Sequence, residues 1–385
     1  MIRSAAQYLF AMSDPAGRFR TLGVPRVVPP GNFRTGNDAV VFRVERDGKP
    51  EMLKCYLRPP QYMPERCRCS QLSPLTASCR WLENEMLISD ENGSPQWVDV
   101  TVGDWIEGES LHDLLFKAVI DRDTETLKTL STLFDRFALR LLAEEWAHGD
   151  VKPDNMIFDG RDLRLVDIDS IFTPQLAGLT TAQLGTEGYR HPARDCNCFD
   201  CSIDDYPIAV MSVTLAALAA DYDLYRMFDR GDGVLIDTEE AVAGCSRAVE
   251  AFTRHFALTG DAAHMAILRM LRSPIPQLEG LDTALRLAAG DAFTYDSGVG
   301  TPQLTPCGGK WGFTNAAGEW VIPAVYDTAF EFEEGFAAVM LGGVWQYITP
   351  YGKPVLISPQ AEAMKPVANG KARIRVNGQW VTTAL

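Results

Sequence analysis

The chain has 385 residues, of which 46% are apolar and 10% aromatic, so it is long enough for two or three globular domains, and its composition excludes a disordered chain. Its formal net charge of −15 argues against general nucleic-acid binding, because phosphates would be repelled. The acidic excess lies in the first 300 residues, since Thr301–Leu385 holds six basic and six acidic residues. Solubility explains this charge most simply, and a basic protein partner is the alternative.

The cysteine content and the N-terminal sequence indicate in which cellular compartment the protein is expected. The nine cysteines are an odd number in a chain too long to need disulfides, and they are expected to be reduced. The apolar stretch Tyr8–Met12 is too short for a signal-peptide core, and no run approaches the length of a membrane span. A cytoplasmic protein with no membrane partner is therefore expected.

The N-terminal part shows strand patterns. Residues 40–46 and 51–56 are predicted to be strands joined by a hairpin at Asp47-Gly48, a dipeptide typical of tight turns. Pro59 to Pro64 interrupt the pattern, and the spacing of apolar residues then predicts a helix over about 77–88. Residues 96–102 alternate in polarity, which predicts another strand.

Helical patterns follow. Apolar residues recur at helical spacing over 111–116 and 124–147, and short strands are predicted at 155–158 and 163–166. Residues 206–220 are almost all apolar but too few to cross a bilayer, so they are expected to form a buried core helix. More helices are expected to about Ala289. Strands followed by helices predict an α+β fold, with an N-terminal sheet lobe and a helical lobe.

The pattern of residue types changes after Asp291, where short β segments recur with a fixed period. Trp311, Trp345 and Trp380 are 34 and 35 residues apart, and each follows a glycine within two positions. The segment EGFAAV at 334–339 is matched by NGKARI at 369–374. A period that runs through several sub-motifs indicates structural repeats, and the glycines between β-branched and aromatic residues predict hairpins.

Three segments in the middle of the chain contain the candidate catalytic and metal-binding residues. They are HGDVKPDN at 148–155, RLVDIDS around Asp167 and GTEGYRHPA at 185–193. In this order and spacing they resemble the catalytic loop, the metal-binding motif and the end of the activation segment of eukaryotic-like protein kinases, in particular compact bacterial ones. The resemblance implies a two-lobed protein-kinase-like fold, with an N-lobe over 1–103 and a C-lobe over 104–290, before a β-rich module over 296–385.

The resemblance also assigns roles. Asp150 is expected to orient the substrate hydroxyl and accept its proton, and Lys152 to place an ammonium against the γ-phosphate of ATP. Asn155 and Asp167 are expected to hold Mg²⁺, which prefers oxygen ligands. Because Lys at position 152 is typical of serine/threonine kinases, the implied substrate is a protein Ser or Thr. Such kinases often act beside a dedicated phosphatase.

Nucleotide-binding residues are expected in the N-terminal part. Lys54 occupies the place of the lysine that contacts the α- and β-phosphates, and Glu85 is preferred over Glu83 as its carboxylate partner on the predicted helix. Within RTGNDAVV, at 34–41, Gly36 is the one surviving glycine of the glycine-rich loop, and Ala39 stands at another of its glycine positions. The segment from Asp104 to Ile106 would offer backbone groups to adenine, and Gly103 before it implies an open back pocket.

Two departures from the family bear on mechanism. Gly149 stands where an arginine usually precedes the catalytic Asp, so activity is expected not to depend on phosphorylation of the activation segment. Asp169 replaces the glycine of the metal-binding motif and reaches unusual backbone angles less easily. Two alternatives to the kinase remain: a pseudokinase scaffold that docks partners through its repeats, and a kinase of small molecules, because HGD also occurs in antibiotic kinases.

The C-terminal repeats resemble WG repeats, named for the pair seen here as Trp311-Gly312. A stabilising β cap and a docking surface for a partner or substrate are both open. The cysteine clusters at 67–69 and 196–201 suggest a zinc site if folding brings them together, and reduced thiols if it does not.

Overall fold

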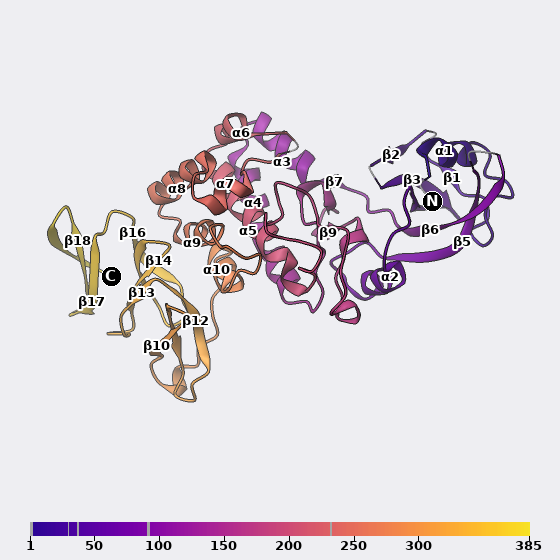
Figure 1. Ribbon diagram of the computed structural model, residues 1–385. Helices are drawn as coiled ribbons and strands as arrows, with labels where there is room; N and C mark the ends of the chain where they lie inside the picture. The colour runs from indigo at the N-terminus through magenta and orange to yellow at the C-terminus, as the bar shows by residue number, and fades with distance from the viewer. Residues whose placement is uncertain (1–2, 30, 37, 91–92, 232) are drawn as a thin grey trace.

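The computed structural model describes residues 3–29, 31–36, 38–90, 93–231 and 233–385. The protein mixes helix and sheet and ends in a β-rich region of small antiparallel sheets. Figure 1 shows an elongated arrangement, with one sheet at the N-terminal end, helices in the middle and the small sheets at the other end. The large cleft described below lies where the N-terminal sheet meets the helical part.

The N-terminal sheet is antiparallel and has the strand order β1-β3-β4-β6-β5, with β2 paired to β3. The predicted hairpin at Asp47-Gly48 is confirmed, because Arg46 pairs with Lys49 across it. One face of the sheet packs on α1 around Tyr8, Phe42 and Met86. The elements are α1 (Ala5–Ser13), β1 (Arg26–Val27), β2 (Phe33–Thr35), β3 (Ala39–Arg46), β4 (Lys49–Tyr56), α2 (Met63–Leu72), β5 (Cys79–Ser89) and β6 (Pro95–Asp104).

The predicted helix over 77–88 is wrong, because this segment forms strand β5. The cause is a β-bulge: the register with β6 shifts between Leu82 and Met86, and Asn84 adopts a left-handed conformation with φ 48°. A bulge adds a residue and so breaks the period of two by which a strand is recognised. The apolar residues on either side then fall at a spacing that imitates a helix.

Helix α2 was not predicted. It begins directly after the proline-rich stretch, with Pro64 in its first turn, a position that proline tolerates because the N–H there has no partner in the helix. Its buried positions include Arg66 and Ser70 beside Met63 and Cys67. Because polar side chains occupy its inner face, the helix shows no apolar stripe in the sequence.

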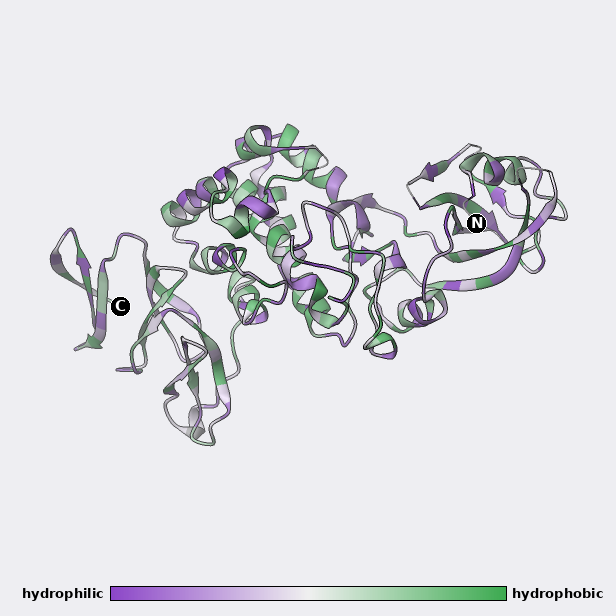
Figure 2. Ribbon diagram, viewed as in Figure 1, coloured by the Kyte–Doolittle hydropathy of each residue, from purple (hydrophilic) through white to green (hydrophobic). Residues whose placement is uncertain are grey.

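The middle of the molecule is built around α5, whose first fourteen residues are all buried. By length and composition, Cys201–Ala220 is long and apolar enough to cross a membrane, but 83% of its most apolar stretch is buried inside the protein. Figure 2 shows hydrophobic and hydrophilic residues alternating along the helices of this region. The predicted buried core helix is therefore confirmed. The elements are β7 (Glu109–Ser110), α3 (Leu111–Ile120), α4 (Thr124–Leu142), β8 (Met156–Phe158), β9 (Leu163–Leu165), α5 (Asp205–Ala220), α6 (Asp223–Phe228), α7 (Thr238–Ala243), α8 (Arg247–Thr259), α9 (Ala262–Met270) and α10 (Leu281–Ala288).

A buried polar triad ties three helices of this region together. Asp135 of α4 accepts a hydrogen bond from the hydroxyl of Ser212 on α5 at 2.7 Å and lies 3.1 Å from Nε2 of His264 on α9. The other ring nitrogen of His264 lies 2.7 Å from a carboxylate oxygen of Asp261. Burial alone would lower the pKa of His264, but the two carboxylates raise it to about 10. The ring is thus a buried imidazolium at neutral pH.

His264 should make stability depend on pH. The pKa of His264 rises from an ordinary 6.5 to about 10 on folding. Its contribution to the free energy of unfolding is therefore complete below pH 6.5 and is lost as pH rises towards 10. Urea unfolding at several pH values should show this decline in the native chain. His264→Asn should lower stability at pH 6.5 by roughly 3–5 kcal/mol, since it leaves the buried carboxylate of Asp135 uncompensated, and should flatten the decline. Parallel pH profiles of the two proteins would contradict the assignment.

The C-terminal region consists of three successive antiparallel sheets, which confirms the predicted hairpins. Each sheet contains one of the repeated tryptophans, and contacts run from each sheet to the next. The strands are β10 (Gln303–Cys307), β11 (Lys310–Thr314), β12 (Trp320–Tyr326), β13 (Thr328–Ala329), β14 (Ala337–Leu341), β15 (Val344–Ile348), β16 (Pro354–Ser358), β17 (Ala363–Ala368), β18 (Lys371–Val376) and β19 (Gln379–Ala384).

The first two sheets are docked on the helices. Phe313, Ile322 and Val339 belong to the same buried cluster as the helical core. The turn at Gly342 lies so close to α9 that a Cβ there would come within 2.7 Å of the backbone nitrogen of Ala266. A glycine is required at this point by sterics as well as by its φ of 55°.

Gly342→Ala is expected to loosen the C-terminal sheets from α9, because its methyl group meets backbone atoms that cannot move aside. Gly335→Ala is the matched control, since Gly335 also has a positive φ, 86°, but a methyl group on it would have no atom within 4 Å. Both variants should lose about 1 kcal/mol from backbone strain. Only Gly342→Ala should lose a further ~1–3 kcal/mol through overpacking, and it alone should show faster proteolysis at the junction. Equal melting temperatures for the two variants would contradict this.

Candidate active site

A cleft of about 1,170 Å³ opens between the N-terminal sheet and the loops of the helical region. Two parts of the chain meet there: strand β4 with the β2–β3 turn, and the loops that follow α4 and β9. Nine of the ten residues predicted for the site line this cleft, and Glu85 is the exception. The nine are Gly36, Ala39, Lys54, Asp104, Ile106, Asp150, Lys152, Asn155 and Asp167.

An ion-pair cluster lies at the centre of the cleft. The ammonium of Lys54 on β4 is 2.5 Å from Oδ1 of Asp167 and 2.8 Å from Oδ2 of Asp169. Burial by itself would lower the pKa of Lys54, but the two carboxylates raise it above its ordinary value. Partial burial works to raise the pKa of Asp167, whose side chain stays partly open to the cleft, and the charge of Lys54 overcomes this and lowers it. The pKa of Asp169 is raised, because its burial outweighs the attraction of Lys54.

Asp169 is the lysine partner that the sequence did not reveal. It lies in a short 3₁₀ turn after Asp167, where its Oδ1 also accepts a hydrogen bond from the Tyr56 hydroxyl at 3.3 Å. Its backbone carbonyl accepts from the guanidinium of Arg66 on α2, which also donates to the carbonyl of Ile171 at 3.0 Å. Arg66 is fully buried, and this burial lowers its pKa to about 10. Asp169, which departs from the kinase resemblance in the sequence, therefore has a defined structural role here.

Glu85 does not pair with Lys54, so this prediction is wrong. Its carboxylate faces the other way from strand β5 and accepts from the N–H groups of Thr21 and Leu22, both at 2.8 Å. It also accepts from the Thr21 hydroxyl at 2.8 Å. Glu83, the alternative, is exposed on the same strand. Glu85 therefore fixes the segment after α1 to the sheet.

Glu85→Ala is expected to lower the free energy of unfolding by roughly 2–4 kcal/mol, because the N–H groups of Thr21 and Leu22, the second of them buried, would lose their acceptor. Glu83→Ala serves as the control and should change stability by about 0.5 kcal/mol or less. Neither variant should alter the affinity of the cleft for a fluorescent ATP analogue. A loss of nucleotide affinity in Glu85→Ala, at unchanged stability, would instead support pairing with Lys54.

The predicted base, Asp150, is held by two neighbours. Its Oδ1 accepts from the backbone N–H of Thr186 at 2.7 Å, and its Oδ2 accepts from Nδ2 of Asn155 at 2.9 Å. The ammonium of Lys152 lies 3.7 Å from Oδ2 of Asp150 and donates to the Thr186 hydroxyl at 3.0 Å. Thr186 is thus a site residue that sequence reasoning missed. It lies more than thirty positions beyond HGDVKPDN, so only folding brings it beside Asp150.

The backbone of this loop is fixed by a buried carboxylate. Asp204, at the start of α5, accepts from the N–H groups of His148 and Gly149 at 2.5 and 2.8 Å. Burial raises the pKa of Asp204 above its ordinary value. Nδ1 of His148 accepts from the N–H of Asp150 at 3.3 Å, which leaves Nε2 to donate to the carbonyl of Val166 at 3.0 Å. These contacts give His148 a structural role in the loop.

Gly149 stands where the chain passes closest to the turn that contains Asp169. It has φ 80°, and a Cβ on it would lie 2.3 Å from the carbonyl oxygen of Ser170. Gly185 approaches from the other side, where a Cβ would lie 2.5 Å from the carbonyl oxygen of Gly149. The guanidinium of Arg194 donates to that same oxygen at 2.9 Å. An arginine at position 149 would therefore not fit this backbone.

The remaining predicted positions line the cleft near the β2–β3 turn and the end of β6. Gly36 donates its N–H to the carbonyl of Ala39 at 2.9 Å in the β2–β3 turn, and Asn37 between them lies outside the described residues. Asp104 ends β6, and Ile106 follows it. The open back pocket expected at Gly103 is absent in the described structure, because β5 fills the space: a Cβ on Gly103 would lie 2.5 Å from Cβ of Cys79.

The two cysteine clusters do not form a metal site. Among the described residues, no group of three or more His, Cys, Asp or Glu side chains has an arrangement that would hold a metal ion. Cys67 instead lies beside Cys79, with 3.3 Å between the sulfur atoms, whereas Cys196 and Cys201 are exposed. The described cysteines are all free, as the expectation of reduced thiols requires.

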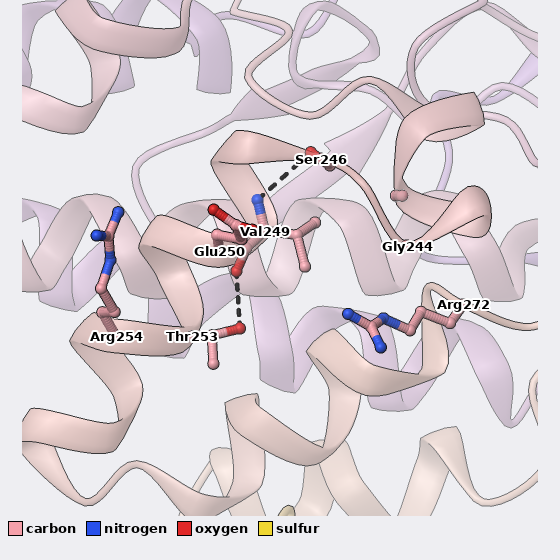
Figure 3. Close-up of a pocket in the computed structure, with 8 residues that line it drawn as sticks. Gly244, Ser246, Val249, Glu250, Thr253, Arg254 and Arg272 are labelled. Atoms are coloured by element: carbon pink, nitrogen blue, oxygen red, sulfur yellow. Dashed lines mark hydrogen bonds between the residues drawn. The ribbon is translucent and has the colours of Figure 1, made fainter.

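A second, smaller cavity of about 290 Å³ lies between α7, α8 and the end of α9 (Figure 3). Its hydroxyl groups are used within α8: Ser246 accepts from the N–H of Val249 at 3.4 Å, and Thr253 donates to the Val249 carbonyl at 2.7 Å. Arg254 and Arg272 at its rim are both exposed. None of the predicted site residues lies there, so the large cleft is the candidate active site.

Comparison with known families identifies one part of the chain. Residues 311–345 match the family described as WG containing repeat, which covers β11 to the start of β15. No curated protein matches the chain as a relative. The C-terminal region therefore contains a WG repeat, in agreement with the resemblance seen at Trp311-Gly312.

Proposed function

We propose that residues 1–290 form a two-lobed protein-kinase-like domain, with lobes over 1–103 and 104–290, that transfers the γ-phosphoryl group of ATP to Ser or Thr hydroxyls of proteins. One observation carries the proposal: Lys54 of β4, Asp150 and Asn155 of the loop after α4, and Asp167 after β9 converge in one cleft. Phosphoryl transfer needs this set, because it depends on positioning and charge neutralisation more than on covalent help. A cytoplasmic location and a partner phosphatase remain expectations from the resemblance.

The residues present fit Mg²⁺. Both bonds that the Asn155 amide nitrogen donates go to Asp150, so the amide oxygen is available as a ligand. The side chain of Asp167 is 46% exposed to the cleft, and only its Oδ1 is paired with Lys54. Mg²⁺ is usually held by one or two protein carboxylates together with substrate phosphates, so no larger acidic cage is required. When bound, the ion would neutralise phosphate charge.

The backbone of Asp167 supports a functional role. It has φ 66° and ψ 70°, the left-handed region that costs a non-glycine residue about 1 kcal/mol or more. The strain is held by the carboxylate contact to Lys54 and by the turn that follows. Such strain often occurs at residues whose side chain must point in one direction for function.

Asp150 is placed to act on a hydroxyl. Asn155 and Thr186 hold its two oxygens in the cleft, which fixes the direction in which it accepts a proton. Lys152, 3.7 Å away, provides positive charge on the same side. Because Thr186 belongs to the segment GTEGYRHPA, the loop that would bear on a protein substrate is joined directly to the proposed base. This junction favours a protein substrate over a small molecule.

Asp150→Asn is expected to lower phosphoryl transfer by about 10²–10⁴-fold, since it removes the proton acceptor but keeps the shape of the loop. Transfer of radiolabel from ATP with Mg²⁺, to the protein itself and to a basic protein such as histone, measures this. Asp154→Asn, an exposed carboxylate in the same loop, is the control and should retain activity. Nucleotide affinity should persist in both variants.

The same assay separates the alternatives. Transfer to amino sugars and not to protein would support a small-molecule kinase. Binding of ATP without transfer to either class of acceptor would support the pseudokinase scaffold, in which Lys54 stays paired with the two carboxylates. Label on Ser or Thr that disappears in Asp150→Asn would support the proposal.

A further inference from the structure

The last sheet of the chain, β17–β19, exposes a face that carries basic side chains. Along β18 the side chains alternate: Lys371, Arg373 and Arg375 are exposed, whereas Ala372 and Ile374 are buried against the preceding repeat. Figure 1 places β17 and β18 at the end of the molecule opposite the N-terminal sheet. The exposed side of this sheet therefore faces solvent and not the helical core.

Neighbouring strands complete the surface. Lys365 of β17 lies directly opposite Arg373, and Trp380 of β19 lies opposite Arg375. The ammonium of Lys365 lies 4.6 Å from the centroid of the Trp380 ring. We name this surface the basic face and define it by Lys365, Lys371, Arg373, Arg375 and Trp380.

A comparison with the preceding repeat shows which side chains the residues of the basic face replace. A shift of 35 residues places Trp345 on Trp380 and EGFAAV on NGKARI. In the preceding repeat the equivalent face is apolar, and it is covered by Met364, Val367 and Ile374 of the last repeat. The four basic residues thus take the positions of four apolar ones, in sequence order Phe330, Phe336, Ala338 and Met340.

One aromatic residue is kept through this exchange. In the preceding repeat the Phe330 ring stacks on Trp345, with centroids 6.2 Å apart, and Trp345 is 8% exposed. In the last repeat Lys365 takes the place of Phe330, and Trp380 is 42% exposed. Trp380, like Trp345, has a side chain packed on its ring, but here the packing residue is the cation Lys365 and the contact is open to solvent.

Solubility does not explain the sign of the charge. A sheet face in contact with solvent needs polar side chains, but carboxylates would serve this purpose at least as well as amines. Like charges directly opposite in a sheet, as in Lys365 and Arg373, are destabilising. Glu362, whose Oε2 lies 3.3 Å from Nε of Arg375, is the one acidic residue in 359–385. The chain as a whole has 51 acidic and 36 basic residues, so this stretch is basic within an acidic chain.

We propose that the basic face binds an acidic segment of a partner protein. Carboxylates would pair with Arg373 and Arg375 through charge-assisted hydrogen bonds, and Trp380 would provide a flat apolar contact. Within the described residues β19 pairs only with β18, so its outer edge is open to an added strand. An extended acidic segment would use both features.

Two other occupants fit less well. The net charge of −15 repels a long polyphosphate chain such as RNA. A second copy of this chain would offer its acidic region to the basic face in a head-to-tail contact, which leads to open-ended assembly and not to a closed dimer. The proposal does not depend on catalysis, so it is tested independently of the proposed kinase activity.

The test is binding of a fluorescein-labelled peptide in which Glu alternates with Thr, measured by anisotropy on the full chain. A peptide with Gln in place of Glu is the probe control. Arg373→Glu should weaken binding of the Glu peptide by about tenfold or more, and added salt should weaken it as well. Lys353→Glu, the same change at an exposed position elsewhere in the C-terminal region, should change it less than about twofold. Circular dichroism checks that both variants are folded.

Three results would overturn the proposal. The first is equal affinity for the Glu and Gln peptides, and the second is equal affinity of Arg373→Glu and the native chain for the Glu peptide. The third is a preferred binding of single-stranded RNA, or concentration-dependent self-association in sedimentation, that disappears in Arg373→Glu. Selective binding of the Glu peptide that is lost in Arg373→Glu and kept in Lys353→Glu would support it.

Discussion

The ammonium of Lys54 lies against two carboxylates, Asp167 and Asp169, that come from one short turn, and this contact joins the N-terminal sheet to the loops of the helical region. Buried charges are costly unless they are paired, so separating the two parts would leave either a cation or two anions without compensation. Arg66 adds to the constraint from α2, because its guanidinium binds the backbone of the same turn. The geometry of the cleft follows from how these few charges are satisfied.

Close backbone contacts complete the site. The loop with Asp150 passes between Ser170 and Gly185 at distances that admit only glycine at 149 and 185. Asp204 then fixes the N–H groups of the loop. Gly149, which departs from the kinase resemblance in the sequence, is thus required by packing. In the proposed function this rigidity would hold Asp150 and Asn155 ready without help from a phosphorylated segment.

The C-terminal repeats serve two structural purposes with one pattern of strands. The first two sheets share the core of the helices, and the turn at Gly342 touches the backbone of α9. The last sheet buries one face on its neighbour and exposes Lys371, Arg373 and Arg375 on the other. The same register of alternating side chains therefore gives an apolar contact in one repeat and a charged surface in the next.

Local patterns and fixed spacings were enough to predict the strands around Asp47-Gly48, the buried helix α5 and the repeat hairpins. The candidates Lys54, Asp150, Asn155 and Asp167 came from the resemblance to protein kinases, and the fold brings them to one cleft. The direction of Glu85, the existence of α2 and the partners of Lys54 emerged only from the folded chain. A bulge in β5 removed the alternation that marks a strand, and a buried arginine removed the apolar stripe that marks a helix. Such features depend on partners distant in the chain, and no local pattern records them.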